Sequence, residues 1–258
     1  MVKKVIKKVA AAVTQFTAWS FSRYNDHRTC ARMAHWKHIL KKPQGPKSPA
    51  MQRGGDIHKE GEHYVGGCEA REFAALPASK RKAYEKKGGR YRLKQVPASF
   101  AAFKKEMEAL RKAGAVAEGK WAMAVDWKPV DFFDWARAWC RVVLDARLAV
   151  AKKARVIDFK TGKVYPDDNE EQMELYAISA FEHEPQATEA EVELWYLDQP
   201  RPMAGEYPNP IKKTYLRKQL PGLQKKWRAK VIPILTDKRF IPNPGRNCGW
   251  CDYSKRKG

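Results

Sequence analysis

The sequence has no long hydrophobic run. No stretch approaches the roughly 18–20 apolar residues that a membrane-spanning helix needs, so we expect no membrane partner. The basic beginning, MVKKVIKKVAAAVTQF, carries only a short apolar stretch, interrupted by Thr14 and Gln15, and no clean cleavage pattern follows it. We therefore expect a cytoplasmic protein.

Cysteine is also scarce. The five cysteines are an odd number in a chain without an evident signal, which argues against a disulfide framework. They are Cys30, Cys68, Cys140, Cys248 and Cys251. The last two form a C-x-x-C, a pattern that can ligate a metal, act in redox chemistry or do neither.

Acidic residues are few compared with basic ones. The chain has 29 Asp and Glu against 51 Lys and Arg, a net charge of +22. Such an excess favours a polyanionic partner, and nucleic acid is the leading candidate. A membrane surface is less favoured, because the basic residues do not gather on one amphipathic helix. A soluble basic protein with no such partner is the alternative that charge alone leaves open.

The run VIDFKTGK, residues 156–163, is the most informative stretch. In a strand, alternate side chains share a face, so Asp158 and Lys160 point the same way and Phe159 points oppositely. A carboxylate beside an ammonium suits metal-dependent phosphodiester chemistry, in which the acid holds a divalent cation and the lysine holds the attacking water or the phosphorane. Alone, Asp-x-Lys is common and also fits a surface ion pair.

A second acid precedes this run. Asp145 lies in an apolar stretch that a short turn around Lys152-Lys153 joins to the strand of Asp158, so a hairpin can bring the two acids together. Two carboxylates with a main-chain carbonyl favour Mg²⁺ or Mn²⁺, and a catalytic zinc would prefer more His or Cys ligands. His58 and Glu62 share a helix face and can add to this site, although an ordinary hydrogen bond at a helix start also explains His58.

With 258 residues, the chain fits one domain with helical additions. Ser20 or Ser22 can cap a helix through residues 23–38, within an N-terminal helical segment 1–45. Apolar periodicity predicts a helical insertion at about 69–114, helical residues around 170–184 and a basic helical segment at 210–236. Residues 191–198 read as an alternating strand, residues 126–135 stay unassigned, and a cysteine-containing tail spans 240–258.

Several short motifs follow one another in order: Gly54-x3-His58-x3-Glu62, Leu-Asp at Asp145, IDFKTGK at 157–163, and Gln172-x3-Tyr176. In this order they resemble the RecB-type branch of the PD-(D/E)XK nuclease superfamily, over residues 17–253. That branch includes bacterial recombination nucleases, phage exonucleases and CRISPR-adaptation nucleases. The resemblance implies an α/β fold with a restriction-endonuclease-like core, in which helices flank a central mixed sheet, and with additional helical segments.

The resemblance also implies roles for individual residues. The catalytic residues it implies are Asp145, Asp158 and Lys160. The metal ligands it implies are His58, Asp145, Asp158 and the main-chain carbonyl of Phe159. The supporting or DNA-contacting residues it implies are Arg53, Glu62, Glu118, Gln172 and Tyr176.

Many relatives in this branch hold an iron–sulfur cluster through four cysteines. Cys30, Cys248 and Cys251 match three of those positions, and Lys257 stands at the fourth. Three thiolates do not make the usual four-cysteine site, although Cys68 or a ligand that is not cysteine could complete it. We therefore do not favour a cluster, and interpret the three cysteines as a remnant of the site.

The resemblance implies a Mg²⁺- or Mn²⁺-dependent DNA nuclease of a bacterial or phage-infected cell. Small stand-alone members are mostly exonucleases of recombination, repair or phage DNA metabolism, so it favours action on DNA ends, with a recombination or single-strand-annealing protein as a candidate partner. The alternatives are a non-cleaving DNA-binding or adaptor subunit and a CRISPR-adaptation nuclease. Exo or endo action, cleavage polarity, strand preference, oligomeric state and host origin are not determined by the sequence.

Overall fold

The computed structural model describes residues 18–66, 78–79, 95–201 and 208–254, and most of the expected helical insertion at 69–114 lies outside them. The chain divides into two compact units. Unit 1 combines Met1–Pro46, Trp121–Val142 and Gln219–Gly258, and unit 2 combines Lys47–Lys120 and Val143–Lys218. The single domain expected from the sequence stays a prediction.

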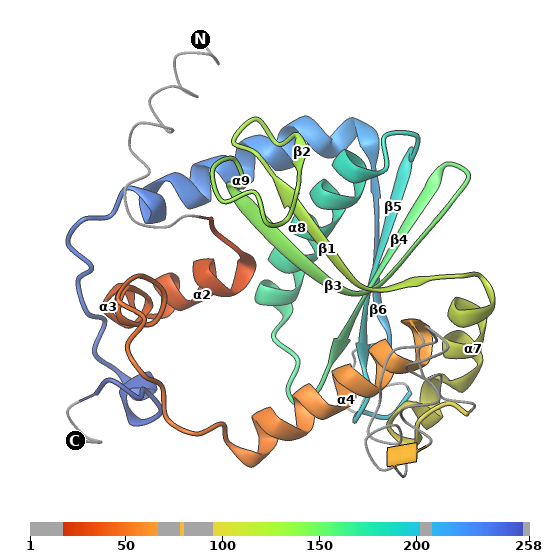
Figure 1. Ribbon diagram of the computed structural model, residues 1–258. Helices are drawn as coiled ribbons and strands as arrows, with labels where there is room; N and C mark the ends of the chain where they lie inside the picture. Colours follow the sequence, from red (N-terminus) through yellow and green to blue (C-terminus); the bar gives the residue numbers. More distant parts are fainter. Residues whose placement is uncertain (1–17, 67–77, 80–94, 202–207, 255–258) are drawn as a thin grey trace. The chain divides into compact units, whose positions relative to one another are not determined.

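Figure 1 labels the α-helices and strands of the described residues. In chain order the elements are α2 (Phe21–Thr29), α3 (Ala31–Ala34), η1 (His35–Ile39), α4 (Pro49–Gly66), η2 (Ala98–Phe103), α7 (Lys104–Lys112), β1 (Val116–Met123), β2 (Pro129–Val130), β3 (Cys140–Val150), β4 (Lys153–Lys160), α8 (Pro166–His183), β5 (Glu189–Tyr196), β6 (Ile211–Leu216), η3 (Arg217–Gln219), α9 (Leu220–Leu235) and η4 (Arg246–Gly249).

The strands form a mixed six-stranded sheet in the order β2-β1-β3-β4-β5-β6. β3 and β4 make the expected antiparallel hairpin, with Ala146 opposite Ile157. β4 and β5 are parallel, so their connection must cross over a face of the sheet, and α8 provides it by packing on both strands. This mixed sheet with flanking helices confirms the α/β fold expected from the sequence.

β4 and β5 are buried strands of unit 2. Val156, Ile157 and Phe159 of β4 are almost fully buried, and their branched or aromatic side chains suit a strand between two others. α4 comes very close to β4 at Gly61, where a side chain would collide with the rings of Phe159 and Phe100. Only glycine allows this approach, which brings α4 against the strand that carries Asp158.

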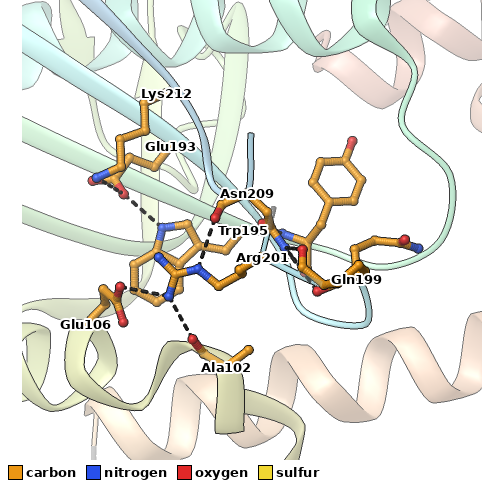
Figure 2. Close-up of polar contacts among 10 residues, drawn as sticks. Ala102, Glu106, Glu193, Trp195, Gln199, Arg201, Asn209 and Lys212 are labelled. Carbon is orange, nitrogen blue, oxygen red and sulfur yellow. Dashed lines mark hydrogen bonds and ion pairs between the residues drawn. The ribbon is translucent and has the colours of Figure 1, made fainter. Parts of the chain in front are cut away.

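A buried carboxylate, Glu193 of β5, lies beside this core. Its Oε2 accepts a hydrogen bond of 2.9 Å from Trp195 Nε1 and pairs with Lys212 Nζ at 3.0 Å (Figure 2). Arg155 pairs with its Oε1. Burial alone would raise the pKa of Glu193, but the hydrogen bonds from Arg155 and Trp195 outweigh it and lower the pKa to about 2. Glu193 is therefore ionised inside the unit.

Arg201 ties the loop after β5 to the helices of unit 2. Figure 2 shows its guanidinium between Asn209 and η2: Nε donates to the Asn209 carbonyl at 3.0 Å and Nη1 to the Ala102 carbonyl at 2.7 Å. It also pairs with Glu106 and lies 4.5 Å above the Phe103 ring. These contacts fix the chain just beyond the carboxyl end of β5.

Unit 1 has an aromatic core. Trp19 and Trp227 stack with centroids 5.6 Å apart, and Trp127 and Trp139 meet Trp19 edge-on at 6.3 and 5.4 Å. The four tryptophans are at most 6% exposed. Because they come from three separate stretches of the sequence, the unit is held together by long-range packing.

Two helical expectations need correction. Ser20 is the cap, since its Oγ accepts from Arg23 N at 3.4 Å, but the helix through 23–38 breaks at Cys30, which is extended. The segment 210–236 begins with the strand β6, which pairs with β5, and its helix, α9, starts only at Leu220. Pairing with β5 decides the conformation of 211–216, a contact that local periodicity does not show.

Among the described residues, no helix is long and apolar enough to span a bilayer.

Candidate active site

β4 presents Asp158 and Lys160 on one face, as the sequence predicts. Lys160 Nζ lies 2.6 Å from Asp158 Oδ2. The ring of Phe159 between them points to the opposite face, where it is 1% exposed in the core. Strand alternation therefore places the ammonium directly against the carboxylate.

Gln172 and Tyr176 of α8 complete a closed set of contacts around this pair. Lys160 Nζ donates to Gln172 Oε1 at 2.7 Å, and Gln172 Nε2 donates to the Tyr176 hydroxyl at 2.7 Å. The hydroxyl donates in turn to Asp158 Oδ1 at 2.5 Å. Burial, followed by the charge of Asp158, raises the pKa of Tyr176 well above its ordinary value. The phenol therefore stays protonated as a donor.

The hairpin brings Asp145 to the same place. Its Oδ2 accepts from Phe159 N at 2.7 Å, and a hydrogen bond of 2.8 Å joins its Oδ1 to His58 Nδ1 from α4. Burial raises the pKa of Asp145, and the charge of Asp158 adds to this, although His58 opposes both. Burial lowers the pKa of His58, but the hydrogen bond and charge of Asp145 outweigh it, so the pKa lies above the ordinary value.

The structure thus gathers six of the residues singled out in the sequence: His58, Asp145, Asp158, Lys160, Gln172 and Tyr176. All six belong to unit 2. They come from α4, β3, β4 and α8, so no single segment forms the site.

Arg53 leads to a residue that sequence reasoning missed, Asp198. Arg53 Nη1 pairs with Asp198 Oδ2 at 3.0 Å, and both Asp198 carboxylate oxygens accept from Gly162 N, at 3.1 and 3.0 Å. Gln199 Nε2 donates to the Gly162 carbonyl at 3.2 Å. Gly162 has a φ of +88°, which suits glycine in the tight turn after Lys160. The sequence signal that could have identified Asp198 is its place as an acid just after β5, the strand parallel to β4.

Glu62 and Glu118 form a second acidic pair in unit 2. Burial, followed by the charge of Glu118, raises the pKa of Glu62, and Asp145 contributes in the same direction. Glu118 in β1 has a φ of +47°, and its side chain is 47% exposed with Lys120 Nζ at 3.5 Å. Both glutamates therefore lie outside the hydrogen-bonded set around Asp158.

Divalent metals are the usual cofactors of sites with such carboxylates. No group of three or more His, Cys, Asp or Glu side chains in the part of the chain described here is arranged to hold a metal ion. The donor chemistry nevertheless fits one. Asp158 Oδ2 is buried and accepts no well-aligned hydrogen bond, and Asp145 is close enough for the two carboxylates to repel each other. A divalent cation would relieve both conditions.

Cys30, Cys248 and Cys251 lie in unit 1. Cys30 Sγ accepts from Asn243 N at 3.4 Å and Cys248 Sγ accepts from Gly245 N at 3.4 Å, and both cysteines, like Cys251, are free thiols. Cys68 and Lys257 lie outside the described residues. Arg32 Nε donates to the Phe240 carbonyl at 3.0 Å, so hydrogen bonds tie the N- and C-terminal segments together. The absence of a cluster stays a prediction.

A search of curated protein sequences found no match. Two solved structures resemble the chain with 11% sequence identity. One is described as a "Putative exonuclease" from Eubacterium rectale, with a TM-score of 0.48 over 91% of this chain and 86% of that one. The other, SSO0001, has a TM-score of 0.36 over 98% and 94%. The family model of the PD-(D/E)XK nuclease superfamily matches residues 18–256, and the chain therefore belongs to this superfamily.

Proposed function

We propose that this chain is a Mg²⁺- or Mn²⁺-dependent DNA nuclease, specifically an exonuclease that hydrolyses phosphodiester bonds at DNA ends in recombination, repair or phage DNA metabolism. The observation that carries the proposal is the closed set of contacts among Asp158, Lys160, Gln172 and Tyr176 beside Asp145. The net charge of +22 supports a polyanionic substrate.

The candidate ligands of the metal are Asp145, Asp158 and the carbonyl of Phe159, with His58 as a further donor. The chemistry that such a cation supplies is Lewis acidity toward the phosphodiester and a more acidic water. Tyr176 donates to Asp158 Oδ1, which fixes the carboxylate, and Oδ2, which lies against Lys160 Nζ, is the oxygen that would also hold the metal. Asp145 is similarly fixed by Phe159 N and His58.

Lys160 is the group that acts on the reacting phosphate. Its ammonium is held between Asp158 and Gln172, so its position is set before the substrate arrives. An ammonium group fixed in this way orients the attacking water and stabilises the charge that develops on the phosphorane. The turn after Lys160 is held by Asp198, which accepts a hydrogen bond from Gly162 N and is itself paired with Arg53. The exonuclease assignment itself rests on the resemblance to small members of the RecB-type branch.

The test uses the purified full chain with end-labelled linear DNA and closed circular DNA, in Mg²⁺, Mn²⁺ or EDTA. We expect cation-dependent loss of the linear DNA alone. D145A, D158A and K160A should each lower cleavage by about 100- to 1000-fold or more while most DNA binding remains. K105A, which removes an exposed lysine of α7, serves as the matched control and should cut normally.

Three outcomes would change the proposal. Cutting of the circle would make the protein an endonuclease. Normal cutting by K160A would mean that the active site lies elsewhere. Tight, salt-sensitive binding without cleavage in any metal would favour the DNA-binding or adaptor subunit.

A further inference from the structure

A short loop of unit 1 carries aromatic side chains to the surface. We call residues 131–137, which follow β2 (Figure 1), the aromatic loop. Phe133 is 60% exposed and Trp135 is 65% exposed. Single exposed apolar residues are ordinary, but two large aromatic side chains on one seven-residue loop form a surface feature that folding does not require.

The aromatic loop holds its own conformation. Asp131 Oδ1 accepts from Phe133 N at 2.7 Å, and Asp134 Oδ1 accepts from Ala136 N at 3.1 Å and Arg137 N at 2.9 Å. Such side-chain-to-backbone bonds fix tight turns. Both carboxylates therefore stabilise the conformation in which the loop exposes its aromatic rings. Arg137 also pairs with Asp134 and neutralises its charge.

Two arginines of unit 1, Arg141 and Arg23, have no acidic partner among the described residues, and Arg141 lies beside the rings of the aromatic loop. The guanidinium of Arg141 lies 4.1 Å from the centroid of Trp135 and 5.5 Å from that of Phe132. Its Nε and Nη2 are buried and make no hydrogen bond to any described residue. Burial lowers the pKa of Arg23, and the positive charge of Arg141 lowers it further, so the two guanidinium groups are close enough to repel each other. Among the described groups, the guanidinium of Arg23 bonds only to the Ala18 carbonyl.

Exposed aromatic faces next to unpaired guanidinium groups match the chemistry of a nucleic-acid strand. Its bases stack on aromatic rings, and its phosphates pair with arginine. In a duplex the base faces are covered by neighbouring bases, so an aromatic platform of this kind favours unpaired nucleotides. An apolar protein partner would leave the repulsion between Arg23 and Arg141 uncompensated, whereas a phosphate would relieve it.

We propose that the aromatic loop binds single-stranded DNA, with Trp135 and Phe133 stacking on unpaired bases and Arg141 and Arg23 holding a phosphate. This inference rests on the proposed DNA nuclease function, and it names the form of the substrate. It concerns unit 1 alone and uses none of the residues of the candidate active site.

The test measures binding of the full chain to a labelled oligothymidylate and to a blunt duplex in EDTA, which prevents metal-dependent cleavage. W135A should weaken binding of the single strand by about 5- to 150-fold, the effect of losing one stacked base, and change duplex binding less than twofold. W135F keeps an aromatic face and should retain most of the affinity. W250A is the matched control, because Trp250 is 85% exposed in the same unit but outside the loop, and it should bind normally.

A second readout reports stacking directly. The fluorescence of 2-aminopurine in a single-stranded oligonucleotide should be quenched by the wild type and by W135F, and less by W135A. F133A supplies an independent variant if W135A does not fold, which thermal melting would reveal. Unchanged single-strand affinity and quenching in both alanine variants would overturn the proposal.

Protein binding would give a different result. If W135A bound DNA normally but lowered the sedimentation coefficient relative to the wild type, the loop would be a contact between protein chains and the proposal would fail. The two proposals fail separately. A wild type that cuts DNA while W135A binds single strands normally refutes only the loop proposal, whereas loop-dependent binding without cleavage refutes only the nuclease.

Discussion

The close approach of α4 to β4 makes a sharp stability prediction, the effect of G61A. A Cβ atom at position 61 would lie 2.5 Å from a ring carbon of Phe159 and 2.6 Å from one of Phe100. The two rings are 1% and 0% exposed and cannot move into solvent. The helix must therefore move away from the strand, or the rings must leave their preferred rotamers.

The magnitude follows from two opposing effects. Overpacking a core costs about 1–3 kcal/mol, and such short contacts favour the upper end. Alanine in a helix interior is more stable than glycine by about 1 kcal/mol. G61A should therefore destabilise unit 2 by about 2 kcal/mol. G55A is the matched control in the same helix, because nothing lies within 4 Å of its Cβ, and it should gain about 1 kcal/mol from helix propensity alone.

Thermal unfolding of the three proteins measures the difference. For a chain of this size, 1 kcal/mol corresponds to roughly 2–4 °C, so G61A should melt about 4–8 °C below the wild type and G55A about 2–4 °C above it. The opposite signs exclude a general effect of replacing glycine in α4. If G61A melted at or above the wild type, the tight contact between α4 and β4 would be wrong.

Three polar side chains can be tested by substitution. The lowered pKa of Glu193, about 2 against 4.5, contributes about 3 kcal/mol to the free energy of unfolding, which is present above pH 4.5 and lost as pH falls through 2. Denaturant unfolding should therefore show that E193Q is less stable than the wild type at pH 7 and loses less stability in acid. Equal changes of the unfolding free energy with pH in the two proteins would contradict this. Y176F removes the donor to Asp158 and should lower the cleavage rate about 10- to 100-fold at unchanged DNA affinity. D198A removes the acceptor of Gly162 N and should lower the cleavage rate about tenfold in single-turnover assays. An unchanged rate would mean that other contacts fix the turn.

The α/β fold and the shared faces of several site residues could both be predicted from the sequence. Asp158, Lys160, Gln172 and Tyr176 obey local spacing rules of a strand and a helix, so their shared faces could be predicted, and the short turn before Lys153 predicted the hairpin with Asp145. Their roles in cleavage stay predictions. The geometry around them is as expected because each motif lies within one element or one hairpin.

Features that depend on tertiary contacts were not predictable in this way. Glu193 lies in an alternating strand where an acid normally faces solvent, yet it is fully buried because Arg155 and Lys212 approach from neighbouring strands. Asp198 had no motif around it, and its role in holding the turn depends on Gly162 being placed beside it by the parallel pairing of β4 and β5.

The tryptophan core of unit 1 has a consequence for the order in which the chain can fold. Trp19 stacks on Trp227 of α9, so this core cannot close until α9 has been synthesised. The helices and strands that carry His58, Asp145, Asp158 and Tyr176 all leave the ribosome before α9 does. Domains generally fold as units during synthesis. Unit 2 can therefore fold before unit 1 is complete, and until α9 is made Trp19 has only Trp127 and Trp139 of this tryptophan core to pack against.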